Sequence, residues 1–574
     1  MTEKIRVPIV AILVALVPLA AHAQLDVPAL PEPVAAPAKP AEGTLSLGLA
    51  DAYAMALERN LDLQVGRYDL ARAQAEILRS VGIFDPKLDL GVDGDYTKSP
   101  AATQLAGAAV TESRNTRFRI GLSELLPSGT SFSLTNRFVR QETNSTFFFL
   151  NPSWSSDLSL QITQPLLRGF GTTVNRAGLV IARNSREQTA TAFVISVVQT
   201  VQQVENAYWD LVAARKAVEV KEQSLELAKK LLGETKERVR VGTSAPIDLV
   251  QSEAAVASRR QELIAARNAA ADAEDALKSV LGFDEPAEWT ASIRTTDDLA
   301  IEPIRPDLDT AIRTALDRRP EIHQQMLAIE AAKLNVAVAK NDTMPRLDLS
   351  GSYGFSGLGG DLTIRNPDTG EVVGTLPGGF DDAFEQLRNF DFPHWTLGVT
   401  FSVPLGNNDA KARLAQRRFE FEKALTRLQA LKQKVILEVR RAVRGLEDSA
   451  ASIDASVAST KLAERNVDAE HTKFKNGLST NFQVLQIQDD LAAAQLTELK
   501  SRVAYRRSLV AYQVATGTLL EAHGIRIADP GSPEVPHDFW GDVKWLRFSD
   551  IETAASRLRD EPAGEPAGDR GGDR

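Results

Sequence analysis

The fold is decided by the stretch from Asn175 to Val241, NRAGLVIARNSREQTATAFVISVVQTVQQVENAYWDLVAARKAVEVKEQSLELAKKLLGETKERVRV. Apolar residues recur in it at an unbroken spacing of seven, namely Val197, Val204, Leu211, Val218, Leu225, Leu232 and Val239. A seven-residue apolar repeat is typical of a coiled-coil seam. Proline is absent from the stretch, so about 65 residues at ~1.5 Å rise predict a helical rod of roughly 100 Å.

The same pattern returns later in the chain. Positions 235 residues further on continue the seam, namely Val439, Leu446, Ile453, Thr460, Val467 and Phe474. The segment ahead of each rod is repeated at an offset of 259, with the matches Ala52 to Ala311, Leu57 to Leu316 and Pro86 to Pro345. A constant offset over a segment of this length indicates duplication. We therefore predict an internal two-fold sequence repeat.

The first residues have the features of an export signal. Two basic residues precede an apolar run over 7–20, and Ala21-His22-Ala23 has the form of a signal peptidase site. We predict a signal peptide at 1–23, followed by a Pro- and Ala-rich linker at 24–43. The alternative is a membrane anchor, but an apolar run of about 14 residues falls short of the ~20 that a spanning helix needs.

The amino-acid composition limits which kinds of molecule the protein is expected to bind. The 574 residues carry a formal net charge of −10, and no run of Lys and Arg alternates with aromatic residues. This composition argues against nucleic acid as a partner. Cysteine is absent, so the protein has no disulfide and no cysteine to carry an N-terminal lipid, and it is expected to hold to a membrane by its fold.

Two segments alternate between apolar and polar residues, as strands with unlike faces do. The first, 86–164, contains four such runs and the second, 346–403, contains two. Long loops are expected on one side only, at 99–115, 141–154 and 357–394. A tight turn, Leu126-Pro127-Ser128-Gly129, lies on the other side. Runs of about 8 to 11 residues after an export signal favour outer-membrane barrel strands over one face of a soluble β-sandwich.

These signals divide the chain into parts. In order they are the first repeat at 44–282 (one helix from Leu47 to Phe84, strands within 86–164, a helical hairpin at 175–281), a connector at 283–306, the second repeat at 307–517 (a helix, strands within 346–403, a helical hairpin at 409–516), and a C-terminal extension at 518–574 with a disordered end. The shorter helices are about half as long as the rods, so two of them stacked end to end are expected to flank one rod.

Each rod ends at a similar turn. The first turn contains Gly242 and the second contains Gly477, each just after the last periodic residue. Glycine at this position allows a left-handed C-cap, and Ser or Thr is expected to start the returning helix. We predict that these turns are the tips of two helical hairpins and the parts of the chain farthest from the membrane.

No motif indicates catalysis. None of the six histidines has a partner at metal-ligand spacing. Asp489 and Asp490 are adjacent on a predicted helix, so their carboxylates point apart and do not form an acid and base pair. The sequence Arg168-Gly169-Phe170-Gly171 lacks the lysine and the spacing of a phosphate loop. We therefore predict no enzyme activity, no metal and no cofactor.

The strands and rods together predict an assembly. Strands in lipid need a closed barrel, and four to six strands per chain fall short of the practical minimum of about eight. Several chains must then share one barrel, and rotational symmetry arranges the rods in a ring around a hollow centre. The predicted fold is an α+β membrane protein, an outer-membrane β-barrel continuous with a long α-helical coiled-coil barrel.

The sequence resembles the TolC family of outer-membrane efflux and secretion channels. The resemblance covers about Thr44 to Gly517 and is carried by the duplicated modules, by QPLLRG at 164–169, by VPLG at 403–406 and by the two Gly-x-Ser tips. It implies a homotrimer in the cell outer membrane, with a twelve-stranded β-barrel against lipid and a helical tunnel in the periplasm. It also implies the exit duct of a tripartite efflux or type I secretion system, joined by a periplasmic adaptor protein to an inner-membrane transporter.

The resemblance assigns residues to two sites. Docking to the adaptor is implied for the tip residues Gly242, Ser244, Asp248, Leu249, Gly477, Ser479 and Leu485. The pore entrance is implied at Gln483 and Gln486, where the relatives place aspartates. Asp489 and Asp490, about one turn further along the same helix, are the alternative source of charge there.

Two alternatives stay open in the sequence. The first half has an extra strand pair, at about 118–138, compared with the family. A trimer has twelve strands if this hairpin lies outside the lipid and eighteen if both of its strands cross it. The alternative function is a structural tether that links the outer membrane to another layer and transports nothing.

Overall fold

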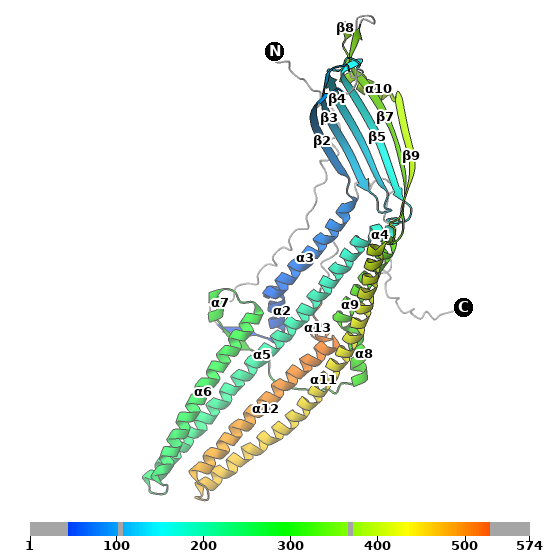
Figure 1. Ribbon diagram of the computed structural model, residues 1–574. Helices are drawn as coiled ribbons and strands as arrows, with labels where there is room; N and C mark the ends of the chain where they lie inside the picture. The colour runs from blue at the N-terminus through cyan, green and yellow to red at the C-terminus, as the bar shows by residue number, and fades with distance from the viewer. Residues whose placement is uncertain (1–43, 102–106, 366–370, 528–574) are drawn as a thin grey trace, which may run out of the picture.

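The computed structural model describes residues 44–101, 107–365 and 371–527. It shows an elongated chain with a curved antiparallel sheet at one end and a layer of long helices running from it to the other end (Figure 1). The predicted signal peptide, the Pro- and Ala-rich linker and the end of the C-terminal extension lie outside the described residues.

Two continuous helices run the length of the helical layer, as the sequence predicts. They are α5 (Ala177–Arg240) and α11 (Asn408–Lys475). The shorter helices are α2 (Leu49–Arg59), α3 (Leu61–Val81), α4 (Thr172–Asn175), α6 (Pro246–Leu281), α7 (Pro286–Thr290), α8 (Leu308–Arg318), α9 (Pro320–Asp342), α12 (Asn481–Thr516) and α13 (Leu519–Ala522). The predicted end-to-end stacking is confirmed, because α3 and α6 both pack on α5, and α9 and α12 both pack on α5 and α11 (Figure 1).

The predicted seam of α5 is buried in the upper helix and shifts near the tip. Val197, Val204 and Leu211 are at most 3% exposed. Further down, Leu232 is only half-buried and its neighbour Leu231 is 2% exposed. An α-helix has 3.6 residues per turn, so a strict seven-residue repeat drifts by about 20° per heptad. Over four or five heptads this drift moves the buried stripe by about one residue.

The single helix expected from Leu47 to Phe84 is wrong. The structure has a short strand, β1 (Thr44–Leu47), and two helices separated at Asn60. The Asn60 side chain accepts hydrogen bonds from the backbone N–H groups of Asp62 and Leu63, and so starts α3 as an N-cap. In the second half, Pro320 starts α9 at the same kind of break.

The connector is also more ordered than predicted. It contains α7 and a strand, β6 (Ser292–Thr295). This strand pairs in parallel with β1, with Leu45 opposite Ile293. The start of the first described segment and the connector are therefore held together beside the middle of α5.

One antiparallel sheet holds all the longer strands. They are β2 (Lys87–Pro100), β3 (Val110–Leu125), β4 (Ser131–Thr143), β5 (Leu150–Pro165), β7 (Arg346–Arg365) and β9 (Phe392–Ser402). They lie in the order β2-β3-β4-β5-β7-β9, with a short β8 (Val372–Leu376) on the upper end of β7. All six predicted runs are confirmed as strands. The extra pair, β3 and β4, lies inside this sheet and is paired along its length with β2 and β5.

The long loops expected on one side are shorter than predicted. Strands β2 to β5 extend well into the first two of them. The third contains β8 and a helix, α10 (Phe380–Asn389), which the sequence analysis missed. The tight turn after Leu125 is confirmed, with Gly129 at φ +91°. This turn faces the helices, because the Ser128 carbonyl accepts a hydrogen bond from the Gly171 N–H at 3.1 Å.

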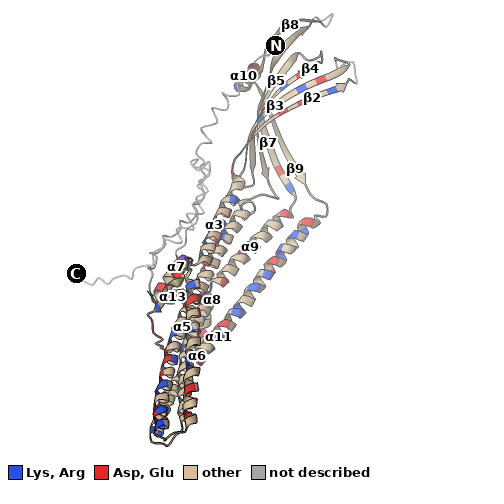
Figure 2. Ribbon diagram, turned by 90° about the vertical axis from the view of Figure 1, so that its left-hand side faces the viewer, with Lys and Arg blue, Asp and Glu red and all other residues tan. Residues whose placement is uncertain are grey.

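The two faces of the sheet differ. One face exposes apolar side chains such as Leu90, Val92, Trp395 and Leu397, while the other carries polar and charged ones. The helix α10 lies across the apolar face near its upper end, since Phe380 contacts the rings of Phe138 on β4 and Trp154 on β5. Figure 2 shows α10, α7 and α13 on the left of the molecule and α11 on the right.

Within the described parts of the chain, no helix combines the length and the apolar character needed to cross a bilayer.

The largest buried cluster lies at mid-height, where α2, α5, α6 and α13 meet. At its centre is the carboxylate of Glu205, 3% exposed. It accepts hydrogen bonds from the Tyr53 hydroxyl at 2.6 Å and the Trp209 indole N–H at 3.4 Å, and His523 Nε2 lies 3.2 Å away. Burial, with the neighbouring Glu205 carboxylate, raises the pKa of the Tyr53 hydroxyl. This network fastens α2, the first described helix, and the residue after α13, the last described helix, to the same point on α5.

Candidate functional site

The two hairpin tips lie at the end of the molecule opposite the sheet (Figure 1). Gly242 and Gly477 have φ values of +80° and +77°, which confirms the predicted left-handed C-caps. At the first tip the Thr243 N–H donates to the Arg238 carbonyl at 2.8 Å. At the second tip the Leu478 N–H donates to the corresponding carbonyl at 2.9 Å. The sequence therefore builds the same cap twice, although the surrounding residues differ.

The returning helices start differently at the two tips. Thr480 is the N-cap of α12, as expected, and forms a capping box with Gln483. At the first tip the prediction is wrong, because Ala245 is the N-cap of α6 and Pro246 fills the first helical position. Proline fits there because it lacks the N–H that would otherwise need a partner.

A carboxylate stiffens the second tip. The Ser479 hydroxyl donates a hydrogen bond to Glu470 Oε1 at 2.5 Å, and the Lys473 ammonium lies 3.0 Å from the other oxygen. The Ser479 hydrogen bond and then Lys473 lower the pKa of Glu470 below its ordinary value. A lowered pKa in the folded state stabilises the tip above the unfolded pKa, and this contribution is lost as the pH falls through the folded pKa.

Most of the predicted docking residues lie at the surface of the tips. Gly242 and Gly477 are exposed, while Ser244, Asp248, Leu249 and Ser479 are half-buried. Leu485 is an exception, since it is 8% exposed and packs with Leu231, Phe474 and Val484. Leu485 therefore belongs to the apolar contact between the two hairpins in this chain and does not contribute to the exposed tip surface.

Arg238 ties the first hairpin to the end of the second rod. Its guanidinium donates to the carbonyls of Phe474 at 2.7 Å and Lys475 at 3.0 Å. It also stacks 4.2 Å from the centre of the Phe474 ring. A cation at the C-terminal end of a helix is favourable, because the last carbonyls carry partial negative charge.

Asn481, 2% exposed, makes a second tie between the hairpins. Its amide oxygen accepts hydrogen bonds from the hydroxyls of Thr235 at 3.1 Å and Ser252 at 3.2 Å. Its amide nitrogen donates to the Asp248 carbonyl at 3.2 Å. One side chain at the start of α12 thus contacts both α5 and α6.

Arg259 makes the third and most extensive tie. Its side chain, on α6, is 3% exposed and donates hydrogen bonds to four acceptors on two other helices, namely the Ser224 carbonyl of α5 at 3.1 Å and, on α12, Gln488 Oε1 at 2.9 Å, the Leu485 carbonyl at 3.3 Å and Asp489 Oδ1 at 2.7 Å. The sequence analysis missed Arg259. The available signal was its spacing of seven from Ser252, which places both polar residues on one face of α6.

The residues predicted for the pore entrance are largely engaged with neighbours. Gln483 takes part in the capping box, and the Gln486 amide donates to Asp490 at 3.3 Å. The Asp489 carboxylate is paired with Arg259, so its charge is compensated within the chain. Asp490 is exposed and has no cationic partner among the described residues.

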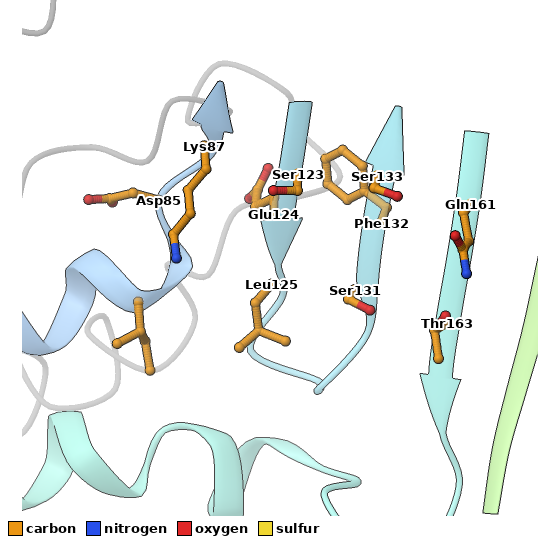
Figure 3. Close-up of a pocket in the computed structure, with 11 residues that line it drawn as sticks. Asp85, Lys87, Ser123, Glu124, Leu125, Ser131, Phe132, Ser133, Gln161 and Thr163 are labelled. Carbon is orange, nitrogen blue, oxygen red and sulfur yellow. The ribbon is translucent and has the colours of Figure 1, made fainter. Parts of the chain in front are cut away.

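No group of His, Asp and Glu with the arrangement of a metal site occurs in residues 44–101, 107–365 and 371–527. A cavity of about 320 Å³ lies far from the tips, at the lower ends of β2 to β5 (Figure 3). Polar side chains from four strands line much of it, namely Lys87, Ser123, Ser131, Ser133, Gln161 and Thr163. Its position places it at the junction of the sheet and the helical layer.

Comparison with known proteins agrees with this architecture. The model of the outer membrane efflux protein family matches residues 52–283 and 311–518. The pyoverdine export outer membrane protein OpmQ of Pseudomonas aeruginosa is 25% identical over 321 residues, or 55% of this chain. The outer membrane protein TolC of Escherichia coli is 22% identical over 316 residues. The match spans 60% of the length of each of these two relatives.

Solved structures share the fold. The outer-membrane channel OprN superposes with a TM-score of 0.59 at 18% identity, and the superposition covers 82% of this chain and 89% of the OprN chain. The CmeC outer membrane channel of Campylobacter jejuni gives a TM-score of 0.59 at 16% identity, and the superposition covers 82% of this chain and 86% of the CmeC chain. The family model matches most of the chain in two parts, each holding one pair of stacked helices, its strands and one helical hairpin. The chain therefore belongs to the outer membrane efflux protein family.

Proposed function

We propose that the protein is the outer-membrane exit duct of a tripartite efflux or type I secretion system. The observation that carries the proposal is the continuity of one sheet, apolar on one face and polar on the other, with a helical layer that ends in two exposed tips. Strands β2 and β9 form the open edges of the sheet. Six long strands are too few to close a barrel in lipid, since about eight are needed. A homotrimer that joins β9 of one chain to β2 of the next closes it.

The trimer forms an eighteen-stranded barrel, because β3 and β4 pair inside the sheet and leave no route for a hairpin outside the lipid. Their turn faces the helices, on the periplasmic side. A cysteine in place of Ser128 is therefore expected to resist a membrane-impermeant maleimide added to intact cells. The Phe148→Cys variant, in the exposed turn between β4 and β5, serves as the control and is expected to react. The natural sequence has no cysteine to interfere. Equal labelling of both variants would contradict the eighteen-stranded barrel.

The tips dock to a periplasmic adaptor that joins the duct to an inner-membrane transporter. They are the exposed end of the helical layer farthest from the sheet, so a partner that arrives from the inner membrane meets them first. The positive φ of Gly242 and Gly477 disfavours larger residues, but a Cβ atom added at either glycine contacts nothing within 4 Å. A tryptophan at either position therefore changes the docking surface without a clash inside the chain.

The experiment that tests this function compares wild type with Gly242→Trp and Gly477→Trp. Wild type is expected to conduct ions in planar bilayers and to support dye efflux from cells that contain the cognate adaptor and pump. The variants should form trimers and conduct, yet lose efflux by at least tenfold. Gly178→Trp, at the other end of α5 and equally free of contacts at its Cβ, is the control and should keep efflux. A wild-type trimer that does not conduct would favour the structural tether.

A further inference from the structure

The chain has one side that faces lipid and one that does not. The apolar face of the sheet carries α10, and the helical layer carries α7 and α13 on the same side (Figure 2). The apolar face has to point outward in a membrane. The polar face of the sheet and the opposite side of the helical layer therefore line the inside of the assembly. This assignment rests on the proposed exit duct.

The upper half of α11 is strongly basic. Residues 408–445 contain eleven Lys and Arg but only four Asp and Glu, in a chain whose net charge is −10. The lower half of the same helix, residues 446–475, has four Lys and Arg and six Asp and Glu. The positive charge is thus concentrated in the part of α11 nearest the sheet.

Four of these basic residues form a stripe along one side of α11, Lys423, Arg427, Lys434 and Arg441. They are spaced by four, seven and seven residues, and all are exposed. Steps of four and seven keep side chains on one face of a helix. The name basic stripe is used below for these four residues.

The basic stripe points away from the outer side of the helical layer. Val435 and Val439 on α11 pack against Ala311 and Ala315 of α8 in one buried cluster. Lys434, a member of the stripe, is one residue from Val435 and five from Val439. At about 100° per residue, it lies roughly 100° to 140° around the helix from these valines, so the stripe is turned away from α8. Figure 2 places α8 to the left of α11, so the stripe faces the inside.

Few acidic groups neutralise the basic stripe. Lys434 lies 3.8 Å from Glu438, which is itself already paired with Arg319, the residue between α8 and α9. Among the described residues, Lys423, Arg427 and Arg441 make no ion pair. Arg441 also lines a groove of about 480 Å³ between α5, α11 and α12, next to Gln202 and Ser508. In the described part of the chain, the inner wall therefore offers guanidinium and ammonium groups without an ion pair beside a largely apolar groove.

The inner face of the sheet carries both basic and acidic groups, and Arg117 and Arg119 are paired with Asp95 and Asp93. Arg119 of β3 and Arg137 of β4 lie directly opposite each other in the ladder. Like charges in this position destabilise a sheet unless an anion lies between them. Arg119 reaches Asp93 at 3.4 Å, whereas Arg137 has no partner in the described structure. Asp157, the residue opposite Arg137 on β5, lies 3.5 Å from His394.

We propose that the cargo of the duct is anionic, a molecule with several carboxylate, sulfonate or phosphate groups that binds the basic stripe on its way to the sheet. A trimer brings three stripes around one lumen, where walls of low dielectric constant strengthen the attraction for negative charge. At physiological salt the field of each stripe reaches only about 8 Å, so binding requires approach to the wall. Arg137, which makes no ion pair among the described residues, supplies a further basic group along the same path.

The test measures binding of pyranine, a fluorescent trisulfonate, to the purified trimer by fluorescence anisotropy in 50 mM NaCl. The variant Lys423→Gln/Arg427→Gln/Arg441→Gln should raise the Kd at least tenfold. The control Lys411→Gln/Arg418→Gln/Lys432→Gln removes the same charge from the same helix. At about 100° per residue, the three control residues lie roughly on the opposite side of α11 from the stripe, and all three are exposed. The control should change the Kd by less than threefold. The conservative variant Lys423→Arg/Lys434→Arg should bind as wild type does.

Several outcomes would overturn the proposal. Equal losses in the stripe variant and in the control would mean that net charge alone attracts the dye. A wild-type trimer that conducts in planar bilayers but does not bind pyranine would refute the anionic cargo and leave the exit duct intact. Absence of conductance would refute the duct itself. If the triple variant does not assemble, Arg137→Gln, a single exposed substitution in the sheet, should still raise the Kd about threefold, and no change would count against the proposal.

Discussion

Replacement of Arg259 by alanine is expected to make the hairpin tips open about a hundred times more often than in wild type. The guanidinium is 3% exposed and its removal leaves the Gln488 amide and two backbone carbonyls without their donor. The carboxylate of Asp489 also loses its cation. Loss of a charged donor from such a buried site costs about 3 kcal/mol, and ~1.4 kcal/mol corresponds to a factor of ten.

Hydrogen exchange measures this opening directly. Backbone amides in α6 around residue 259 and in α12 around residue 488 should lose protection, while those at mid-height, near Glu205, should not change. Arg267→Ala is the control, because Arg267 lies on the same helix but is 61% exposed in its side chain and has a single pair, with Glu222. Surface pairs of this kind contribute about 0 to 1 kcal/mol. Equal protection in wild type and Arg259→Ala would show that the tie does not hold the hairpins together.

The elements that the sequence predicts correctly are those with a long and regular pattern of apolar residues. Val204 and Val439 belong to seven-residue repeats long enough to define one buried face, and both are fully buried. The glycines at the two tips follow the last periodic residue, where a helix needs a left-handed residue. In the strands, alternation with period two gave both the strand and its faces, so Leu90 and Trp395 are on the apolar side as expected.

Features that depend on one residue or on distant contacts were not predictable in this way. The break at Asn60 is a local N-cap inside a pattern that otherwise continues as a helix. Arg259 reads as an ordinary charged position, because its burial depends on α12, which lies more than 200 residues further along the chain. The helix α10 was missed because only ten residues form it, which is too short for a repeating apolar pattern to stand out. Its apolar side chains pack on the strands beneath it and not on another helix.

The residues of the site were harder to predict than the fold, because their exposure depends on contacts between segments that are far apart in the chain. The tip residues Gly242 and Gly477 were found because their role is set by their own backbone. Leu485 was assigned to the docking surface, yet it is buried between the hairpins, which only the packing of α12 against Leu231 and Phe474 reveals. Whether a side chain at a tip is exposed depends on how the two hairpins pack together. A sequence motif at a tip therefore does not show which of its residues are available for docking and which are buried between the hairpins.

The substitution Gly357→Ala is expected to detach α10 from the sheet. A Cβ atom at Gly357 would lie 2.0 Å from the Ala383 carbonyl oxygen, in the backbone of α10. Helix backbone cannot yield as a flexible side chain does, so the helix has to move as a unit. Its contacts would then be lost, namely the buried side chains of Ala383 and Leu387 and the two hydrogen bonds that Gln386 makes with the backbone of Leu358 at 3.0 Å.

Limited trypsin digestion provides the measurement, because Arg388 is exposed within α10 and the docked helix protects the bond that follows it. We expect cleavage there to be at least ten times faster in Gly357→Ala than in wild type. Overpacking in a tight contact costs about 1–3 kcal/mol, which is enough to shift a ten-residue helix from docked to free. Gly374→Ala, in β8 of the same connection, has no atom within 4 Å of the added carbon and should be cleaved as wild type is. If Gly357→Ala resists trypsin as well as wild type does, α10 does not rest on the glycine face of β7, and its hydrogen bonds to Leu358 are not what holds it on the sheet.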